Sequence, residues 1–475
     1  MPPFVNTTLA GGPGILTISD THNLVQPIFV MEAPMRHSIS LTLLLLLSII
    51  IAPSGCGSDN EAFTPLSTAT PTPASQADLY MRKGPYLMLT TEHSGMTVLW
   101  QSQDNISPKA SIEWGSEPTN YGPAHEVQET GAGENEHQFI YTIRHLPEHS
   151  RTYYRVTIVE AGNGKAHEYE GSFMTPPEAA ASSLTFYAYG DTRDSPSMHN
   201  NVLHWIRSDA LNASPPNERQ TFLLHSGDFV HRGLEEPYWD SDYFHYNSYE
   251  STSEFLKTMP VIGSVGNHEC YTTGPVFHYN ADIVRKYWPY DFYKTQSYYY
   301  SFDYGPVHFI VLDVYTSEYN PGSAQYVWLT QELSQSSKPW KIVMFHYPPY
   351  DAGAGDAEVV AGPDGYANTE DIRSYLCPLF EQCGVKLVLS GHRHYYSRSE
   401  VPVAADPSRK IRYLILGGGG APLSVPDPIS GYVVVAKSAY HFARIEITGN
   451  ELQVTALEVI DGEHAPDIID QFIIK

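Results

Sequence analysis

The chain is poor in cysteine. Its 475 residues include only four, Cys56, Cys270, Cys377 and Cys383, and no two of them form a Cys-x-x-Cys pair. A cluster of zinc-bound thiolates normally uses such pairs, so the spacing argues against one. Cys377 and Cys383 lie close enough in sequence to form a disulfide in an oxidising compartment. Two free thiols near the end of a helix are the alternative, and the sequence leaves both open.

Basic residues are also scarce. The chain has 28 lysines and arginines against 53 acidic residues, which gives a formal net charge of −25. Such a chain does not offer the basic face that binds nucleic acid, so we expect no nucleic-acid partner. If the substrate is an anion, positive charge must come from a local source, and bound metal ions are one such source. Most of the acidic residues are interpreted as serving solubility.

Only one stretch is apolar over a long run. Ile39 to Ile51 is interrupted by nothing more polar than Ser and Thr, and it follows the short basic start Arg36–His37. Its 13 residues are too few to span a membrane comfortably but suit the apolar part of an export signal. Small residues and Cys56 come next, so residues 35–56 resemble a bacterial lipoprotein signal, in which the cysteine is lipidated after cleavage. Pro53 departs from the aliphatic residue usual there, and a plain secretory signal is the alternative.

The resemblance implies an exported protein that is attached to the membrane by a lipid anchor at Cys56, or is otherwise periplasmic or extracellular. An export signal normally stands at the N-terminus, and residues 1–34 would precede it. We therefore expect translation to start at Met35 or Met31. Residues 57–78 are rich in Ser, Thr, Pro and Ala, which is typical of a flexible tether.

The segment 79–176 predicts short strands separated by turns. Six runs, among them MTVLWQS and TYYRVTIVEA, have strand composition, and Asn163–Gly164 between the last two is a strong hairpin signal. Roughly seven short strands in about a hundred residues predict an all-β sandwich. The stretch MTPPEAAASS at 174–183 follows as a linker.

From residue 184 to the C-terminus the pattern changes to α/β. Six apolar runs, each resembling a buried strand, are followed at once by Gly, Asp, Asn or His, as in LTFYAYGD and VKLVLSGH. Helical stretches at 197–211 and 324–336 fall between some of them. Strands that alternate with helices and turn polar at their carboxyl ends predict a layered α/β domain with its site at one sheet edge.

The polar residues at those strand ends are of the types that bind metal ions. Oxygen and imidazole donors without thiolates suit Mn, Fe, Zn or Mg, and six candidates are too many for one catalytic zinc. They are enough for two metals that share a carboxylate. The candidates are Asp191, Asp228, Asn267, His346, His392 and His394.

In order along the chain, GD, GD, GNHE, H and GHRH are similar to the motifs of the calcineurin-like metallophosphoesterases, which include the purple acid phosphatases. RKGPYLML, MTVLWQS and TYYRV add a weaker resemblance to the fibronectin III-like N-terminal domain of purple acid phosphatases. The resemblance implies a four-layered α/β/β/α metallophosphoesterase domain at 184–475, preceded by a fibronectin III-like sandwich.

The resemblance also implies roles for individual residues. Asp191, Asp228 and His394 would hold a first metal ion, and Asp228 would bridge to a second. That ion, also Fe, Mn or Zn, would be held by Asn267, His346 and His392. The expected reaction is hydrolysis of a small phosphomonoester, with His268 as the general acid that protonates the leaving group. The alternatives are a phosphodiesterase of the same fold acting on nucleotides or lipid head groups, or a surface binding lipoprotein with a vestigial metal site.

Two positions depart from the family pattern. Many members have His two residues after the first Asp, but this chain has Arg193, which does not bind metal. Arg193 is a candidate for contacting the phosphate, and a salt bridge with Asp194 is the alternative. His231 stands where purple acid phosphatases have a tyrosine ligand to iron, so we do not expect this protein to be purple. Whether His231 binds metal is left open.

Three weaker signals complete the set. Glu269 is a candidate for orienting His268 or a ligand imidazole. The run of glycines at 417–420 lacks the Lys-Ser/Thr of a phosphate-binding loop and predicts a tight turn near the site. His225 and His308 lie within apolar strands and are expected to be core histidines rather than ligands.

Overall fold

The computed structural model describes residues 77–130, 137–213, 219–273, 276–294, 297–353, 365–429 and 431–475. They belong to one compact unit that runs from Glu61 to Lys475. The predicted export signal, Cys56, the alternative start sites and the tether up to residue 76 lie outside the described residues. Within the described residues, no helix is long and apolar enough to cross a membrane.

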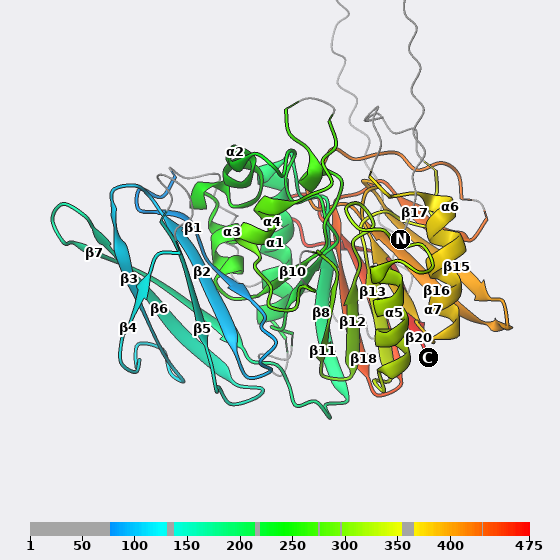
Figure 1. Cartoon of the computed structure of the whole chain (residues 1–475), viewed down its shortest axis with the longest axis horizontal. Coiled ribbons are helices and arrows are strands. Elements are labelled where there is room, and N and C mark those ends of the chain that lie inside the picture. The colour runs from blue at the N-terminus through cyan, green and yellow to red at the C-terminus, as the bar shows by residue number, and fades with distance from the viewer. Residues whose placement is uncertain are drawn as a thin grey trace, which may run out of the picture. The chain divides into compact units, whose positions relative to one another are not determined.

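The N-terminal part folds into two antiparallel sheets (Figure 1). Along β6 every second side chain is buried. Successive side chains of a strand point to opposite faces, so this alternation lets one face of the strand pack on the core. Among the seven N-terminal strands that the structure describes, the sequence missed only β4, whose four residues carry too little pattern to be recognised. One sheet has the order β1 (Met81–Met88), β2 (Met96–Ser102), β5 (His137–Ile143); the other has the order β4 (His125–Gln128), β3 (Ile106–Gly115), β6 (Arg151–Glu160), β7 (Ala166–Met174).

This sandwich packs on the rest of the chain through buried polar contacts. The Lys83 ammonium is fully buried and lies 2.6 Å from Asp240 Oδ1. Burial lowers the pKa of Lys83 to about 8 even though Asp240 opposes the shift. Arg82 pairs with the same carboxylate, and Tyr86 donates its hydroxyl to the carbonyl of Tyr287 at 2.9 Å. A buried charge that loses its partner is costly, so these pairs fix how strand β1 meets the second domain.

The α/β part contains two larger sheets. In the first, β8, β9 and β10 run parallel, and in the second β12, β13, β14 and β16 run parallel. The first sheet has the order β10 (Val261–Gly263), β9 (Leu223–His225), β8 (Ser183–Tyr189), β18 (His441–Thr448), β19 (Glu451–Glu458), β20 (Asp467–Ile474). The second has the order β11 (Tyr300–Tyr304), β12 (Val307–Val311), β13 (Trp340–Met344), β14 (Leu387–Ser390), β16 (Asp406–Leu416), β15 (Tyr396–Val403), β17 (Val433–Lys437).

The two sheets face one another across an aromatic core. The ring of Phe309 on β12 lies 5.1 Å from Phe186 on β8 and 5.3 Å from Phe222, which precedes β9. Edge-to-face contacts of this kind contribute beyond the apolar area that they bury. Helices cover the outer faces, with α1 (Pro196–Leu211) and α3 (Glu250–Leu256) on one side and α5 (Ala324–Gln335) and α7 (Cys377–Gln382) on the other (Figure 1). The predicted α/β fold is confirmed, including helices α1 and α5.

Shorter helical segments complete the domain. Helix α1 has proline at its first turn, where the missing N–H costs nothing, and α5 is capped by Ser323, whose hydroxyl accepts from the amide of Tyr326. The other segments are α2 (Glu236–Tyr238), η1 (Trp239–Tyr243), η2 (His245–Asn247), η3 (His268–Cys270), α4 (Asp282–Tyr287), α6 (Thr369–Asp371) and η4 (Ile372–Leu376).

Candidate metal centre

The six predicted ligands lie in loops that follow the carboxyl ends of parallel strands. Asp191 follows β8, Asp228 follows β9 and Asn267 follows β10 in the first sheet. In the second sheet, His346 follows β13, while His392 and His394 follow β14. The glycine run at 417–420 joins the two groups of loops, because Gly419 N donates to Gly190 O at 2.8 Å and Ala421 N donates to Asp191 O at 2.8 Å. The structure thus places the predicted turn at the site.

Asp191, Asp228 and His394 form one cluster. One ligand atom from each lies within 4.8 Å of the others, and all three residues are buried. These are the residues that the family resemblance implies for the first metal ion. Ligand atoms bound to one cation at about 2.1 Å lie roughly 3 to 4 Å apart, so this spacing fits a shared cation after a small contraction.

The remaining ligands adjoin the same carboxylates. His346 Nε2 lies 3.2 Å from Asp228 Oδ1 and 3.8 Å from Asp191 Oδ1. His392 Nδ1 lies 3.2 Å from Asn267 Oδ1, and the rings of His346 and His392 have centroids 5.4 Å apart. Asp228 therefore stands between the first group and the second, where the carboxylate shared by two ions is expected.

In two of the buried imidazoles, His346 and His394, Nδ1 contacts a backbone carbonyl, and this contact directs Nε2 toward the carboxylates. His346 Nδ1 lies 2.7 Å from the carbonyl of Ser226, and His394 Nδ1 lies 2.8 Å from that of Pro422. A carbonyl only accepts, so both Nδ1 atoms must donate. This leaves Nε2 of His346 and of His394 facing carboxylates. Metal-binding histidines commonly have this backing, and the donor set fits a cation at this position.

Backbone strain is concentrated at the same place. Asp191, Asp228 and His392 have φ values of 57°, 58° and 69°. Residues other than glycine rarely occupy this left-handed region, and such outliers cluster at functional sites, where surrounding contacts hold them. Here Asp191 N donates to Gly227 O at 3.0 Å, and Asp191 Oδ1 accepts from His392 N at 3.0 Å.

Glycines leave room for the carboxylates. A Cβ on Gly266 would lie 2.2 Å from Asp228 Oδ1, and one on Gly391 would lie 2.4 Å from Asp191 Oδ2. Atoms cannot approach so closely, so any side chain at either position would displace a carboxylate from the centre. This is why glycine precedes the polar residue in GNHE and GHRH.

The charges of the cluster are strongly coupled. Burial alone would lower the pKa of His346, but Asp228 and then Asp191 raise it to about 9. Burial opposes ionisation of Asp228 as well, yet the imidazoles of His346 and His268 hold its pKa well below the usual range. Burial, with some help from Asp228, raises the pKa of Asp191 to about 7. A proton on His346 and a cation therefore compete for one position.

Comparison with known proteins identifies this arrangement. Residues 184–396 match the family model described as "Calcineurin-like phosphoesterase". These residues form a calcineurin-like metallophosphoesterase domain. The resemblance predicted from the GD, GNHE and GHRH motifs is confirmed.

Two of the curated relatives, both from plants, illustrate the similarity. Purple acid phosphatase 22 of Arabidopsis thaliana is 27% identical over 373 residues, which cover 74% of this chain and 76% of that protein. A phosphoenolpyruvate phosphatase of Allium cepa is 28% identical over 429 residues, covering 81% of this chain and 80% of that protein. Both alignments are longer than the domain matched by the family model, so the similarity extends beyond that domain.

Two solved structures share the fold. The purple acid phosphatase isolated from yellow lupin (Lupinus luteus) seeds has a TM-score of 0.63 and 18% identity, covering 83% of this chain and 74% of that one. The structure of PhoD has a TM-score of 0.59 and 12% identity, covering 85% of this chain and 91% of that one. At these identities the likeness concerns the fold alone, and it supports the four-layered architecture.

Within the metallophosphoesterase domain, Arg193 reaches the metal cluster. Its guanidinium pairs with Asp194, as the alternative interpretation expected, and its Nε lies 3.7 Å from Asp228 Oδ2. An Nη atom of Arg193 lies 3.4 Å from His394 Nε2, so the lone pair of His394 accepts from it. A permanent cation therefore stands beside two of the ligands predicted for the first metal. Contact of Arg193 with a phosphate stays a prediction.

His231 is turned toward a different carboxylate. Its Nδ1 lies 2.9 Å from Asp194 Oδ1, whereas its carbonyl accepts from His268 Nδ1 at 2.7 Å. Despite burial, His231 and then Arg193 lower the pKa of Asp194 to about 2. In this conformation the ring of His231 pairs with Asp194, and the backbone carbonyl of His231 orients the ring of His268.

Glu269 does not contact an imidazole side chain in the way the sequence suggested. Its carboxylate accepts from three backbone amides, those of Gly266 and Asp228, at 2.8 and 2.9 Å, and Phe229, at 2.8 Å. It is completely buried, and burial together with the charge of Asp228 raises its pKa to about 7. Glu269 thus ties the loop after β10 to the loop that carries Asp228.

The residues given weaker roles are also placed. His225 is buried and makes contacts with Thr192 Oγ1 at 3.0 Å and with the amide of Gly227 at 3.2 Å, as expected of a core histidine. His308 contacts Asp303, with Nδ1 2.7 Å from Oδ1. The ring of Tyr347 lies beside a predicted ligand, with its centroid 4.6 Å from that of His392. Cys377 and Cys383 are free thiols.

A cavity of about 420 Å³ lies elsewhere. It is lined by Ser183 and Thr185 at the amino end of β8 and by His149 and Thr448, among others. Asp191 follows the opposite end of β8, so this cavity is separate from the metal centre and lacks its ligand set.

Proposed function

We propose that this protein is a metal-dependent phosphomonoesterase with two metal ions. One observation supports this above all: buried imidazoles and two carboxylates, from five loops on two sheets, converge at one place. Asp191, Asp228 and His394 would hold one ion. Asp228 would also contribute to the other ion, held with Asn267, His346 and His392. The donor set of oxygen and nitrogen suits Fe, Mn or Zn.

Two bound cations would offset the negative charge of a phosphoester and lower the pKa of a water molecule, which supplies the nucleophile. The residues of the chain orient the predicted ligands and hold their loops in place. The carbonyls of Ser226 and Pro422 orient His346 and His394, and Glu269 holds the Asp228 loop in place. Pre-organised groups of this kind need not reorganise when charge develops in the transition state.

His268 would protonate the leaving group. Its Nδ1 donates to the carbonyl of His231, so its Nε2 is directed at the centre, 3.9 Å from Asp228 Oδ2. The residue is only 4% exposed, which keeps bulk water away from the proton that it would transfer. General acids contribute roughly 10²- to 10⁴-fold to such reactions.

Removal and return of metal tests the function. We expect protein treated with chelator to hydrolyse no phosphoester, and protein reloaded with Mn, Zn or Fe to hydrolyse phosphomonoesters faster than matched diesters. Elemental analysis of the active form should give about two ions per chain. Faster turnover of diesters would support the phosphodiesterase alternative. A reloaded protein without turnover on either class would support the vestigial site instead.

We also propose that the protein is exported and anchored by a lipid at Cys56. The support is the apolar run Ile39–Ile51 before Cys56 and the Ser/Thr/Pro-rich stretch 57–78. Mass spectrometry of the native protein should find a lipidated N-terminal Cys56. A mature protein that still contains residues 1–34 would contradict the proposal.

A further inference from the structure

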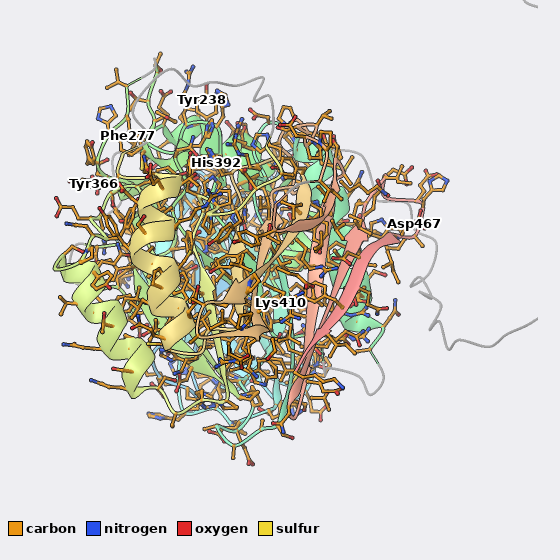
Figure 2. All side chains as sticks on the ribbon, turned by 90° about the vertical axis from the view of Figure 1, so that its right-hand side faces the viewer. Tyr238, Phe277, Tyr366, His392, Lys410 and Asp467 are labelled. Atoms are coloured by element: carbon orange, nitrogen blue, oxygen red, sulfur yellow. The ribbon has the colours of Figure 1, made fainter. Side chains whose placement is uncertain are left out.

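A chain of aromatic rings leads from His268 to the surface. The rings of His268 and Tyr271 have centroids 5.6 Å apart, and those of Tyr271 and Phe277 are 5.8 Å apart. The contact from Phe277 to Tyr279 is 5.2 Å, and that from Tyr279 to Tyr366 is again 5.2 Å. Figure 2 shows Phe277 and Tyr366 on the same side of His392. We call the set of Tyr271, Phe277, Tyr279 and Tyr366 the aromatic wall.

The wall changes from buried to exposed along its length. Tyr271 is 5% exposed, whereas Tyr279 is 56% and Tyr366 is 40% exposed. Within the described residues, neither outer tyrosine makes a side-chain hydrogen bond, and each contacts the other through its ring. Two adjoining aromatic rings that offer their faces to solvent beside a reactive centre are typical of a surface that binds a flat ligand.

The backbone holds the wall in place. His278 N donates to Cys270 O at 2.9 Å, which pairs the segment of Phe277 with the end of the GNHE motif. Tyr366 N donates to Tyr315 O at 3.2 Å. The glycine before Tyr366 has a φ of 60°, and a Cβ there would lie 2.2 Å from Tyr315 O. The outer rings are therefore mounted on fixed backbone, which lowers the entropic cost of stacking a ligand on them.

The side of the site on which the wall lies indicates what it binds. A general acid must stand next to the oxygen that leaves, so the leaving group lies on the His268 side of the phosphorus. The aromatic wall begins at His268. Its first ring, that of Tyr271, lies next to the ring of His268, so the wall extends from the leaving-group side of the site.

We propose that the aromatic wall binds the leaving group of the substrate, and that the preferred substrate is a phosphomonoester whose leaving group carries a flat ring. Tyr279 and Tyr366 would be specificity-determining residues, since they offer exposed ring faces. This inference rests on the proposed phosphomonoesterase function, and in particular on His268 as the general acid.

The test compares two esters with the same leaving atom. Adenosine 5′-monophosphate and ribose 5-phosphate both release a primary 5′-hydroxyl, but only the first has a flat base. In metal-loaded protein, the double change Tyr279→Ala and Tyr366→Ala should lower kcat/KM for adenosine 5′-monophosphate about tenfold. The loss should appear in KM, because a stacked base is held equally in the ground and transition states. Ribose 5-phosphate should be unaffected.

Two control proteins separate stacking from damage. The double change to Phe keeps both rings, so it should retain wild-type kinetics on both esters. Tyr246→Ala removes a tyrosine of similar exposure, 38%, which lies near the sandwich and should change neither ester. An equal loss on both esters, or no loss on either, would overturn the proposal.

Failure of the phosphatase function has a different signature. A metal-loaded wild type that hydrolyses neither ester would refute that function but leave the wall testable. Calorimetry on the same protein then compares binding of adenosine 5′-monophosphate with that of ribose 5-phosphate. Tighter binding of the adenosine ester that disappears in the Ala variant supports the wall, and equal binding of the two esters refutes it.

Discussion

Changing His268 to Asn is expected to lower kcat for an alkyl phosphomonoester by roughly 10²- to 10⁴-fold. An alkoxide is a poor leaving group and needs the proton that His268 Nε2 would deliver. A nitrophenolate leaves without one, so the same variant should lose far less activity on 4-nitrophenyl phosphate. The measurement is kcat for both esters in metal-loaded protein. A similar loss on the two esters would show that His268 supports the site without acting as an acid.

The pH profile gives an independent check on His268. Burial, and then the positive charge of Arg193, lower the pKa of His268 to about 4. The acid form is the active one, so activity should fall as pH rises through that pKa, which gives an acidic optimum. Replacing Arg193 with Met removes a repelling cation, so the pKa of His268 rises and the alkaline limb moves to higher pH. Arg193→Lys keeps the charge and serves as the control.

The experiment with Arg193→Met distinguishes two roles of this residue: lowering the pKa of His268 through its charge, and binding the phosphate. If the alkaline limb of Arg193→Met coincides with that of wild type, His268 does not set the limb. If Arg193→Met raises KM for every ester without moving the limb, the guanidinium binds phosphate instead, which is the other interpretation of this residue. The guanidinium of Arg193 now contacts Asp194 and His394. A small rotation of its side chain would turn it toward the substrate, so both outcomes are compatible with the structure.

The clustering of the predicted ligands could be anticipated because each one follows a buried strand. The strands of both sheets are short apolar runs, and a polar residue directly after such a run stands out in the sequence. Parallel neighbours bring their carboxyl ends to one edge, so the convergence of Asp191, Asp228 and Asn267 follows from the pattern. The edge strand β20 was missed because its outer face is exposed and its sequence, DIIDQFII, does not follow a simple alternation.

Other features of the site could not be predicted, because they depend on contacts between residues that are far apart in the sequence. The carboxylate of Glu269 accepts amides from a loop about 40 residues earlier, and nothing in GNHE indicates that partner. Arg193 is a departure from the family in sequence, but its approach to His394 requires the strand of one sheet to meet a loop of the other. Tyr279 and Tyr366 are far apart in sequence and look like ordinary tyrosines until the fold brings them together.

Changing Asp228 to Asn is expected to have the largest effect. Asparagine has the same shape and its oxygen still accepts the amide of His268, a bond of 3.1 Å in the wild type. It lacks the negative charge that two cations share, so both ions should bind weakly. We expect kcat to fall by at least about 10³-fold, because metal-assisted activation of water and the offset of substrate charge are lost together.

Metal content and thermal stability show whether Asp228 acts by holding metal. Ions that bind only the folded state stabilise it, so chelator should lower the melting temperature of the wild type. The Asp228→Asn protein should contain fewer than one ion per chain, and chelator should leave its melting temperature unchanged. Asp194→Asn is the matched control, since Asp194 pairs with Arg193 and His231 beside the cluster and should keep both ions. An Asp228→Asn protein that retains two ions would exclude Asp228 as the shared ligand, because an amide in place of the central carboxylate cannot neutralise a pair of cations.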